Sequence, residues 1–268
     1  MDLSKGMQLA RRLSPSVRYS FGNNMEKKVF FLHVHKCGGT SILNSIAATY
    51  GFSNNIARRR FGDLSNEASV KAANLVGSTP EDFRENILLY YMSLPDMRYI
   101  YGHFSYSERA MKEYGSDWNF ITVLRDPISR WFSHYFMDRY KEERSFYASI
   151  DEELGDFLHS ERSLWEARKY VLMFTDDITL EEASSQAAID QAIENLKKFS
   201  IVGFLDRLND FSIEFESRLG TYLRIPKLNK SPISKVEQKK LVTPAIRKKV
   251  EAICEPSTQV YQAIRALK

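Results

Sequence analysis

The sequence has only two cysteines, Cys37 and Cys254, among its 268 residues. Two cysteines form no disulfide framework, and neither lies in a CxxC pair of the kind typical of zinc sites. No apolar run approaches the roughly 18 residues of a membrane-spanning helix, and the first residues lack the apolar core of a signal peptide. These absences exclude a disulfide-rich secreted scaffold and favour a cytoplasmic protein in a reducing environment.

Internal repeats and low-complexity segments are also missing, which excludes solenoid and fibrous architectures. Hydrophobic residues make up 43% of the chain, enough to bury a core in a chain of this length. We therefore expect one domain over residues 28–268, preceded by a loosely packed N-terminal arm over residues 1–27.

Charged residues are plentiful but unevenly distributed, although the net charge is only +4. Residues 29–223 carry 21 Lys and Arg against 29 acids, whereas residues 224–268 carry 11 against three. The basic C-terminal segment is either a solvated surface or part of a site for an anionic ligand. Its basic stretches lack regularly spaced aromatic residues and no recognised module is present, so we expect no nucleic-acid partner.

Apolar, strand-like segments alternate with helical ones along the chain. Strands are expected over residues 28–34, 98–103, 118–124 and 200–205, the first a near-continuous apolar run typical of a strand covered on both faces. Helices are expected over residues 39–51, 79–94, from 126 onward, across much of 150–199, over 206–220 and in the C-terminal segment, whereas residues 54–69 resemble a loop. This order predicts an α/β fold with a parallel sheet between helices, and ligands at the carboxyl ends of its strands.

Capping residues support several of these helices. Thr79 and Asp126 each precede a proline, a pairing that favours a helix start. Gly51 and Gly220 stand where two helices should end.

The first polar cluster is Lys-Cys-Gly-Gly-Thr-Ser, directly after the first strand. Glycines let a backbone turn tightly and approach a ligand closely. The N–H groups of the following helix have no internal partner, and with the helix dipole they attract anions. Lys36 adds a positive charge, and two hydroxyls add donors, so the cluster is typical of a phosphate-binding loop.

The cluster is not a Walker A motif, because that motif has its lysine after the glycines. Here Lys36 precedes Gly38 and Gly39. This order argues against a P-loop kinase or nucleotide hydrolase that uses ATP and magnesium, although that alternative stays open. The other alternative is a tight strand-to-helix turn without any ligand.

The second cluster, Arg-Asp-Pro-Ile-Ser-Arg-Trp-Phe-Ser, follows the strand over residues 118–124. A buried strand rarely ends on an unpaired arginine. Arg125 is able to bind a phosphate bidentately, and Ser133, two helical turns further on, could donate to the same group. The alternative is a structural pair between an arginine and a carboxylate; Arg130 could pair with Asp126 or another acid.

Together the two clusters resemble the cofactor-binding motifs of the sulfotransferases that use 3′-phosphoadenosine 5′-phosphosulfate (PAPS). His33 to Thr40, "HVHKCGGT", resembles their 5′-phosphosulfate loop, and "LRDPISRWFS" resembles their 3′-phosphate motif. The likeness is greatest to the carbohydrate sulfotransferases of the heparan sulfate 6-O- and 2-O- type and their bacterial relatives. It covers roughly residues 28–268 and implies a P-loop-type sheet with a helical, acceptor-binding elaboration.

The resemblance implies transfer of a sulfuryl group from PAPS to an acceptor hydroxyl or amine, with PAP as product and no metal. Lys36 stands where the family has its catalytic lysine, and "YGHFS" resembles the segment that carries the acceptor-activating base, which makes His103 the candidate base and Glu108 a substitute. His33, inside the first strand, is better explained as a packed core histidine. The cofactor-binding residues implied are Lys36, Cys37, Gly38, Gly39, Thr40, Ser41, Arg125, Ser133, Lys230 and Ser231.

Cys37 is expected to contribute its backbone to phosphate binding, and its place beside Lys36 and a helix N-terminus should lower the pKa of its thiol. The acceptor pocket is expected between residues 52–97 and 140–195. A glycan, a glycolipid and a small metabolite are all compatible acceptors. The sequence determines neither the acceptor nor the oligomeric state.

Overall fold

The computed structural model describes residues 25–50, 61–141, 149–226 and 231–268. Five parallel strands form one sheet in the order β2-β3-β1-β4-β5. Their bounds are Lys28–Leu32 (β1), Phe61–Asp63 (β2), Tyr99–Gly102 (β3), Trp118–Leu124 (β4) and Ile201–Phe204 (β5). The sequence analysis predicted four of these strands. It was wrong about β2, which it assigned to a loop, because three residues are too few to show the alternation of apolar and polar side chains that identifies a strand.

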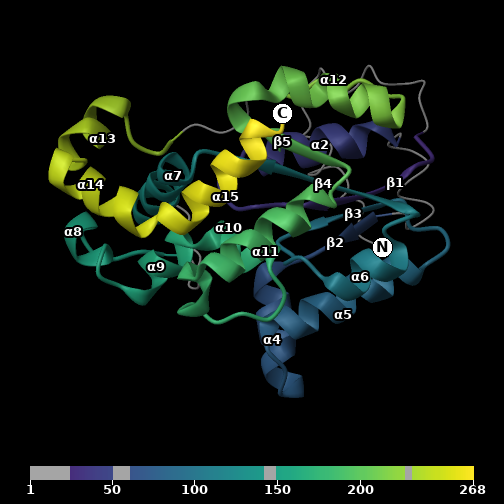
Figure 1. The fold of residues 1–268 in the computed structure, drawn as a ribbon, viewed down its shortest axis with the longest axis horizontal. Coiled ribbons are helices and arrows are strands. Elements are labelled where there is room, and N and C mark those ends of the chain that lie inside the picture. The colour runs from purple at the N-terminus through teal and green to yellow at the C-terminus, as the bar shows by residue number, and fades with distance from the viewer. Residues whose placement is uncertain (1–24, 51–60, 142–148, 227–230) are drawn as a thin grey trace, which may run out of the picture.

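Helices cover both faces of the sheet (Figure 1). One face packs against α2 (Gly39–Thr49) and α12 (Leu208–Leu219). The other packs against α5 (Pro80–Ser93), α6 (Glu108–Tyr114), α10 (Lys169–Phe174), α11 (Gln186–Lys197) and α15 (Glu255–Ala266). Because both faces are covered, β1 and β4 are apolar at almost every position. The α/β class with a parallel sheet flanked by helices is therefore confirmed.

A third core lies beside the sheet, at the left of Figure 1. It is centred on α7 (Pro127–Tyr140), whose buried aromatic side chains meet α8 (Leu154–Phe157), α9 (Glu161–Ala167) and α14 (Pro244–Ile253). The short α13 (Lys235–Leu241) precedes α14, and α4 (Asn66–Val76) packs on α5. Two 3₁₀ turns, Glu182–Ser184 and Leu205–Arg207, complete the described elements.

The predicted capping residues mostly stand where expected. The Thr79 and Asp126 side chains accept hydrogen bonds from the N–H groups of the first turns of α5 and α7, and both helices begin with proline. Gly220 ends α12 in a left-handed conformation with φ of 77°. Gly51 lies outside the described residues, and α2 ends at Thr49. Helix α4 was missed, although Ser65 caps it.

The first described residues belong to the packed body, not to an arm. Met25 is buried and donates its N–H to the Thr49 carbonyl, and the Lys27 carbonyl accepts from the Tyr50 hydroxyl. The packed domain therefore begins by residue 25. No helix among the described residues is long and apolar enough to cross a membrane.

The strand order places the topological switch point, where a crevice is expected, at the carboxyl ends of β1 and β4. From β1 the chain continues to β2, on one side of the sheet, and from β4 to β5, on the opposite side. Neighbouring strands whose connections leave in opposite directions open such a crevice, the usual ligand position in open α/β sheets. Lys36 follows β1 and Arg125 follows β4, so both predicted clusters lie there.

Candidate functional site

The backbone between β1 and α2 forms a concave turn. Lys36 and Gly38 have positive φ values of 67° and 76°. Cys37, between them, does not have a positive φ, and Gly39 already belongs to helix α2. A backbone that alternates in this way points successive N–H groups into one concavity, which is an anion-binding nest. The N–H groups of Gly38, Gly39 and Thr40 have no acceptor among the described residues.

The two glycines serve different purposes. Gly38 occupies the left-handed position that favours glycine. Gly39 is helical, but a Cβ there would overlap the His33 ring. The sequence analysis attributed the glycines to a tight turn and to close approach of a ligand. Gly38 makes the turn, whereas Gly39 makes room for the His33 ring.

Two residues of the loop do not fit the roles expected of them. The Cys37 thiol is buried, and burial raises its pKa rather than lowering it. The Cys37 N–H donates to the Val34 carbonyl at 3.3 Å, and the Ser41 N–H to the Gly38 carbonyl at 3.1 Å. Neither amide is therefore available to an anion, and the predicted backbone role of Cys37 is wrong for this structure.

Lys36 and Arg125 bring two cations to the nest. The Arg125 guanidinium donates to the Lys36 carbonyl at 3.1 Å, which joins the ends of β1 and β4. Neither side chain forms an ion pair with any described residue. The sequence analysis considered a structural ion pair between Arg125 and a carboxylate, and no described carboxylate forms it. Burial lowers the pKa of Lys36 to about 8, an effect that the nearby Asp138 partly offsets.

Tyr170 on α10 connects the two clusters through its hydroxyl group, which contacts a residue of each. Its hydroxyl accepts the Arg125 N–H at 2.8 Å, donates to the Arg125 carbonyl, and lies 3.6 Å from the Cys37 sulfur. Burial raises the pKa of both Cys37 and Tyr170, so both stay protonated. The thiol is therefore the donor to the hydroxyl, whose bonding capacity is filled.

Three histidine rings gather at the carboxyl ends of β1 and β3. The His35 and His103 rings are stacked with centroids 3.3 Å apart, and His33 lies 4.3 Å from His103. Burial lowers the pKa of each; the pKa of His103 falls to about 4. All three imidazoles are therefore neutral at physiological pH. His33 packs against the neighbouring ring of His103, and the sequence analysis expected a packed histidine there.

Hydrogen bonds distinguish the two stacked rings. His103 Nδ1 lies 2.7 Å from the His33 carbonyl, which only accepts, so Nδ1 carries the hydrogen and Nε2 is bare. His35 Nε2 lies 3.3 Å from the Asn66 amide nitrogen, which only donates, so its lone pair is engaged. His103 Nε2 has no partner among the described residues. His103 is therefore the better placed base.

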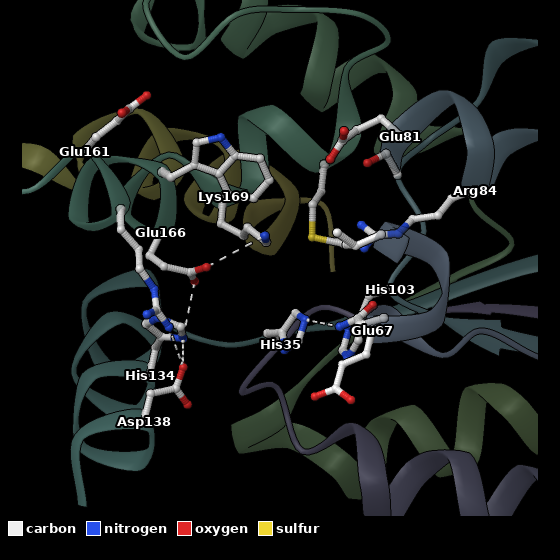
Figure 2. Close-up of a pocket in the computed structure, with 16 residues that line it drawn as sticks. His35, Glu67, Glu81, Arg84, His103, His134, Asp138, Glu161, Glu166 and Lys169 are labelled. Carbon is white, nitrogen blue, oxygen red and sulfur yellow. Dashed lines mark hydrogen bonds and ion pairs between the residues drawn. The ribbon is translucent and has the colours of Figure 1, made fainter. Parts of the chain in front are cut away.

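A cavity of about 620 Å³ opens above the stacked rings (Figure 2). It is lined from both segments that the sequence analysis assigned to a pocket, 52–97 and 140–195. The lining residues are His35, Asn66, Glu67, Val70, Glu81, Arg84, His103, Ser105, His134, Asp138, Glu161, Arg162, Trp165, Glu166, Lys169 and Met173. The volume falls in the range of about 300–1,000 Å³ typical of small-molecule sites.

A buried ionic network forms one wall of this cavity. Glu166 lies 2.7 Å from the Arg130 guanidinium and 3.8 Å from both the Lys169 ammonium and His134 Nδ1. Burial alone would raise the pKa of Glu166, but His134, Lys169 and Arg130 together hold it well below its usual value. The partner of Arg130 is thus Glu166, not Asp126.

The network continues to Asp138, which accepts from the Arg162 guanidinium at 2.9 Å. Burial raises the pKa of Asp138 to about 6, although Lys36 and Arg162 oppose the shift. Asp138 and Lys36 each affect the other's pKa, so the cavity borders the nest electrostatically. Lys36 itself is not among the cavity-lining residues.

Two buried acceptors of the cavity wall have no partner: Asn66 Oδ1 and His134 Nε2. His134 Nδ1 faces two carboxylate oxygens, of Asp138 at 3.5 Å and of Glu166 at 3.8 Å, which only accept, so the hydrogen resides on Nδ1. An unpaired buried acceptor costs about 1–3 kcal/mol. The wall is therefore able to accept hydrogen bonds from donor groups of a ligand.

Several predicted side chains make no contact that supports a binding role. Ser133 lies half-buried on α7 and forms no hydrogen bond with a described residue, and the Thr40 side chain is exposed, although the Thr40 N–H belongs to the nest. Ser231 is exposed and accepts from the Gln238 amide at 2.8 Å. Lys230 lies outside the described residues. Glu108 is exposed and pairs with Lys198 at 2.8 Å, away from the cavity, so it is not a substitute base.

Sequence reasoning missed most of the cavity wall. His134, Asp138, Glu166 and Lys169 come from three helices, and only the spacing within each pair, i, i+4 and i, i+3, gave a local signal. His35 was noted beside the loop, but its stacking on His103 depends on the pairing of β1 with β3. The described residues contain no group of three side chains arranged to hold a metal ion.

Comparison with known proteins returned no relative: no protein-family model and no curated protein matches this chain.

Proposed function

We propose that the protein is a PAPS-dependent sulfotransferase that acts on an acceptor hydroxyl or amine. One observation carries the proposal. The nest, with two cations that have no described ion-pair partner, borders the His33 ring, which lies 4.3 Å from that of His103. His103 is a neutral imidazole with a bare Nε2, and all these groups follow the carboxyl ends of β3, β1 and β4. An anionic donor fits the nest and its cations, and an acceptor proton fits the imidazole.

PAPS would supply the sulfuryl group, whose bond to the donor phosphate breaks as a bond to the acceptor forms. The three free N–H groups of the loop would hold the 5′-phosphate side of the donor, and Arg125 another of its phosphates. The Lys36 ammonium would offset the charge that develops on the leaving oxygen. His103 Nε2 would take the acceptor proton, while its Nδ1–H keeps the ring oriented through the His33 carbonyl.

The lysine-first order of the loop supports this reading over a magnesium-dependent kinase. The cavity above His103 would hold the acceptor, and a cytoplasmic location agrees with the cysteine usage. Residues 25–268 would form the catalytic domain.

The test is calorimetric titration of the purified protein with PAP and, separately, with ATP and magnesium. We expect PAP to bind at least about tenfold more tightly, since two of its phosphates meet cations. Tighter binding of ATP with magnesium would overturn the proposal and favour a kinase or hydrolase. A variant with Lys71→Ala, an exposed lysine on α4, is the control for general charge effects.

A further inference from the structure

The unpartnered polar atoms in the wall of the cavity above His103 are hydrogen-bond acceptors. Its unpartnered buried atoms, Asn66 Oδ1 and His134 Nε2, are both hydrogen-bond acceptors. The His134 side chain is only 8% exposed. His103 Nε2 is a third bare acceptor in the same wall.

The charges of the cavity have the same bias. Five carboxylates line it against three cations, and two of those cations, Lys169 and Arg162, are already paired with carboxylates. The third, Arg84, donates its Nε–H to Ser69 at 3.0 Å. The three histidines of the wall add no charge, because burial keeps them neutral.

Two exposed carboxylates lie at opposite sides of the cavity. Glu81 lies in the first turn of α5 and Glu161 in the first turn of α9, and Figure 2 shows them facing across the opening. Both are exposed, and neither forms an ion pair with a described residue. Trp165 lies between the Glu161 and Lys169 segments and exposes 36% of its surface, an apolar face for the ligand.

We infer that the acceptor is an amine-bearing polyol, such as a short amino sugar, and that polyanionic glycans are rejected. The inference rests on the proposed function, since it takes the cavity as the acceptor site. Hydroxyl and ammonium groups are donors and would meet the bare acceptors and the two rim carboxylates. A sulfated or carboxylated chain would bring further negative charge to a wall where carboxylates outnumber cations five to three, and repulsion would exclude it.

The test uses three short oligosaccharide probes: chitotriose, its fully N-acetylated form, and a hyaluronan tetrasaccharide. Each is titrated calorimetrically into the protein, with and without saturating PAP. We expect chitotriose to bind about tenfold or more tightly than its N-acetylated form, because the ammonium forms charge-assisted bonds. The hyaluronan fragment should not bind.

Variants locate the effect. Glu81→Gln combined with Glu161→Gln should remove most of the preference for chitotriose and leave PAP affinity unchanged, whereas Glu113→Gln, on the exposed surface of α6, should change neither. Equal or tighter binding of the N-acetylated or hyaluronan probe would overturn the inference, as would no binding of chitotriose. Absence of PAP binding would instead overturn the proposed function, so the two failures are distinguishable.

Discussion

The crevice at β1 and β4 and the cavity above β3 differ in how their charges are arranged. In the crevice, Lys36 and Arg125 lie together without a described carboxylate partner, beside free backbone N–H groups. In the cavity, Lys169 and Arg162 are paired, and the unmet groups are acceptors. One region is therefore built to receive an anion, and the other to receive hydrogen-bond donors.

The histidine stack lies between the two regions and belongs to both. His33 packs on Gly39 of the nest, whereas His35 and His103 line the cavity. An imidazole at this boundary would lie beside both reactants of the proposed group transfer. The difference between the regions therefore suggests an order of importance for the side chains, which substitutions test.

The largest effect is expected at the boundary. His103→Gln should lower kcat about 10²- to 10⁴-fold, because the glutamine side chain cannot take a proton, while the Kd for PAP stays unchanged. Steady-state sulfation of an acceptor and titration with PAP measure the two quantities. His159→Gln, at an exposed histidine, is the control. A near-normal kcat would remove His103 as the base.

The next effect is expected at the nest. Lys36→Ala should lower kcat about 10²- to 10³-fold, since one stabilising cation is lost. The pKa of Lys36 is about 8, so the wild-type kcat/KM should fall as pH rises through that value and the ammonium loses its proton. Lys36→Arg should move this alkaline limb upward. A limb that stays at pH 8 in that variant would assign it to Lys169, whose pKa is also about 8.

A smaller effect is expected for the second cation of the crevice. Arg125→Ala should raise the Kd for PAP about 10- to 100-fold, since a charged hydrogen bond is worth about 1.5–3 kcal/mol, with little effect on acceptor binding. The measurement is titration with PAP, and Arg207→Ala, at an exposed arginine, is the control. Unchanged affinity would contradict a phosphate role for Arg125.

Tyr170 tests whether the scaffold beneath the crevice positions both clusters. Tyr170→Phe removes a hydroxyl that bonds the Arg125 backbone, so the unfolding free energy should fall by about 1–3 kcal/mol. PAP affinity should fall several-fold while acceptor affinity is retained. Denaturant unfolding and the two titrations measure these effects; equal losses in both affinities would indicate general destabilisation.

The last comparison concerns the pH dependence of stability, which distinguishes the neutral imidazoles from the charged network. His33, His35, His103 and His134 all have pKa values below 6.5 in the folded state. The unfolded chain therefore binds more protons between about pH 6.5 and pH 4, and stability falls with acidification, by at most about 1.4 kcal/mol per pH unit for each imidazole. His103→Gln should reduce this slope by one proton. Unfolding curves at several pH values that show no such slope would contradict burial of the rings.

Local patterns account for the regions of the molecule that were predicted well. Apolar runs marked β1, β3, β4 and β5, and the Lys36–Gly39 turn and the Asp126 cap follow from neighbouring residues alone. The edge strand β2 and the helix α4 escaped prediction because one is too short for periodicity and the other has a weak apolar face. The cavity wall escaped because its carboxylates and cations meet only after helices distant in sequence pack together.

The sequence by itself determined the class of the fold and the presence of a cationic, glycine-containing loop after the central strand. Those properties depend on side-chain periodicity and on the conformations that neighbouring residues allow. Only the tertiary structure decided that Gly39 makes room for His33, that Cys37 stays protonated, and that Glu166 is the partner of Arg130. Burial and long-range contacts set those outcomes, because the free energy of a charge depends on what surrounds it in the folded chain.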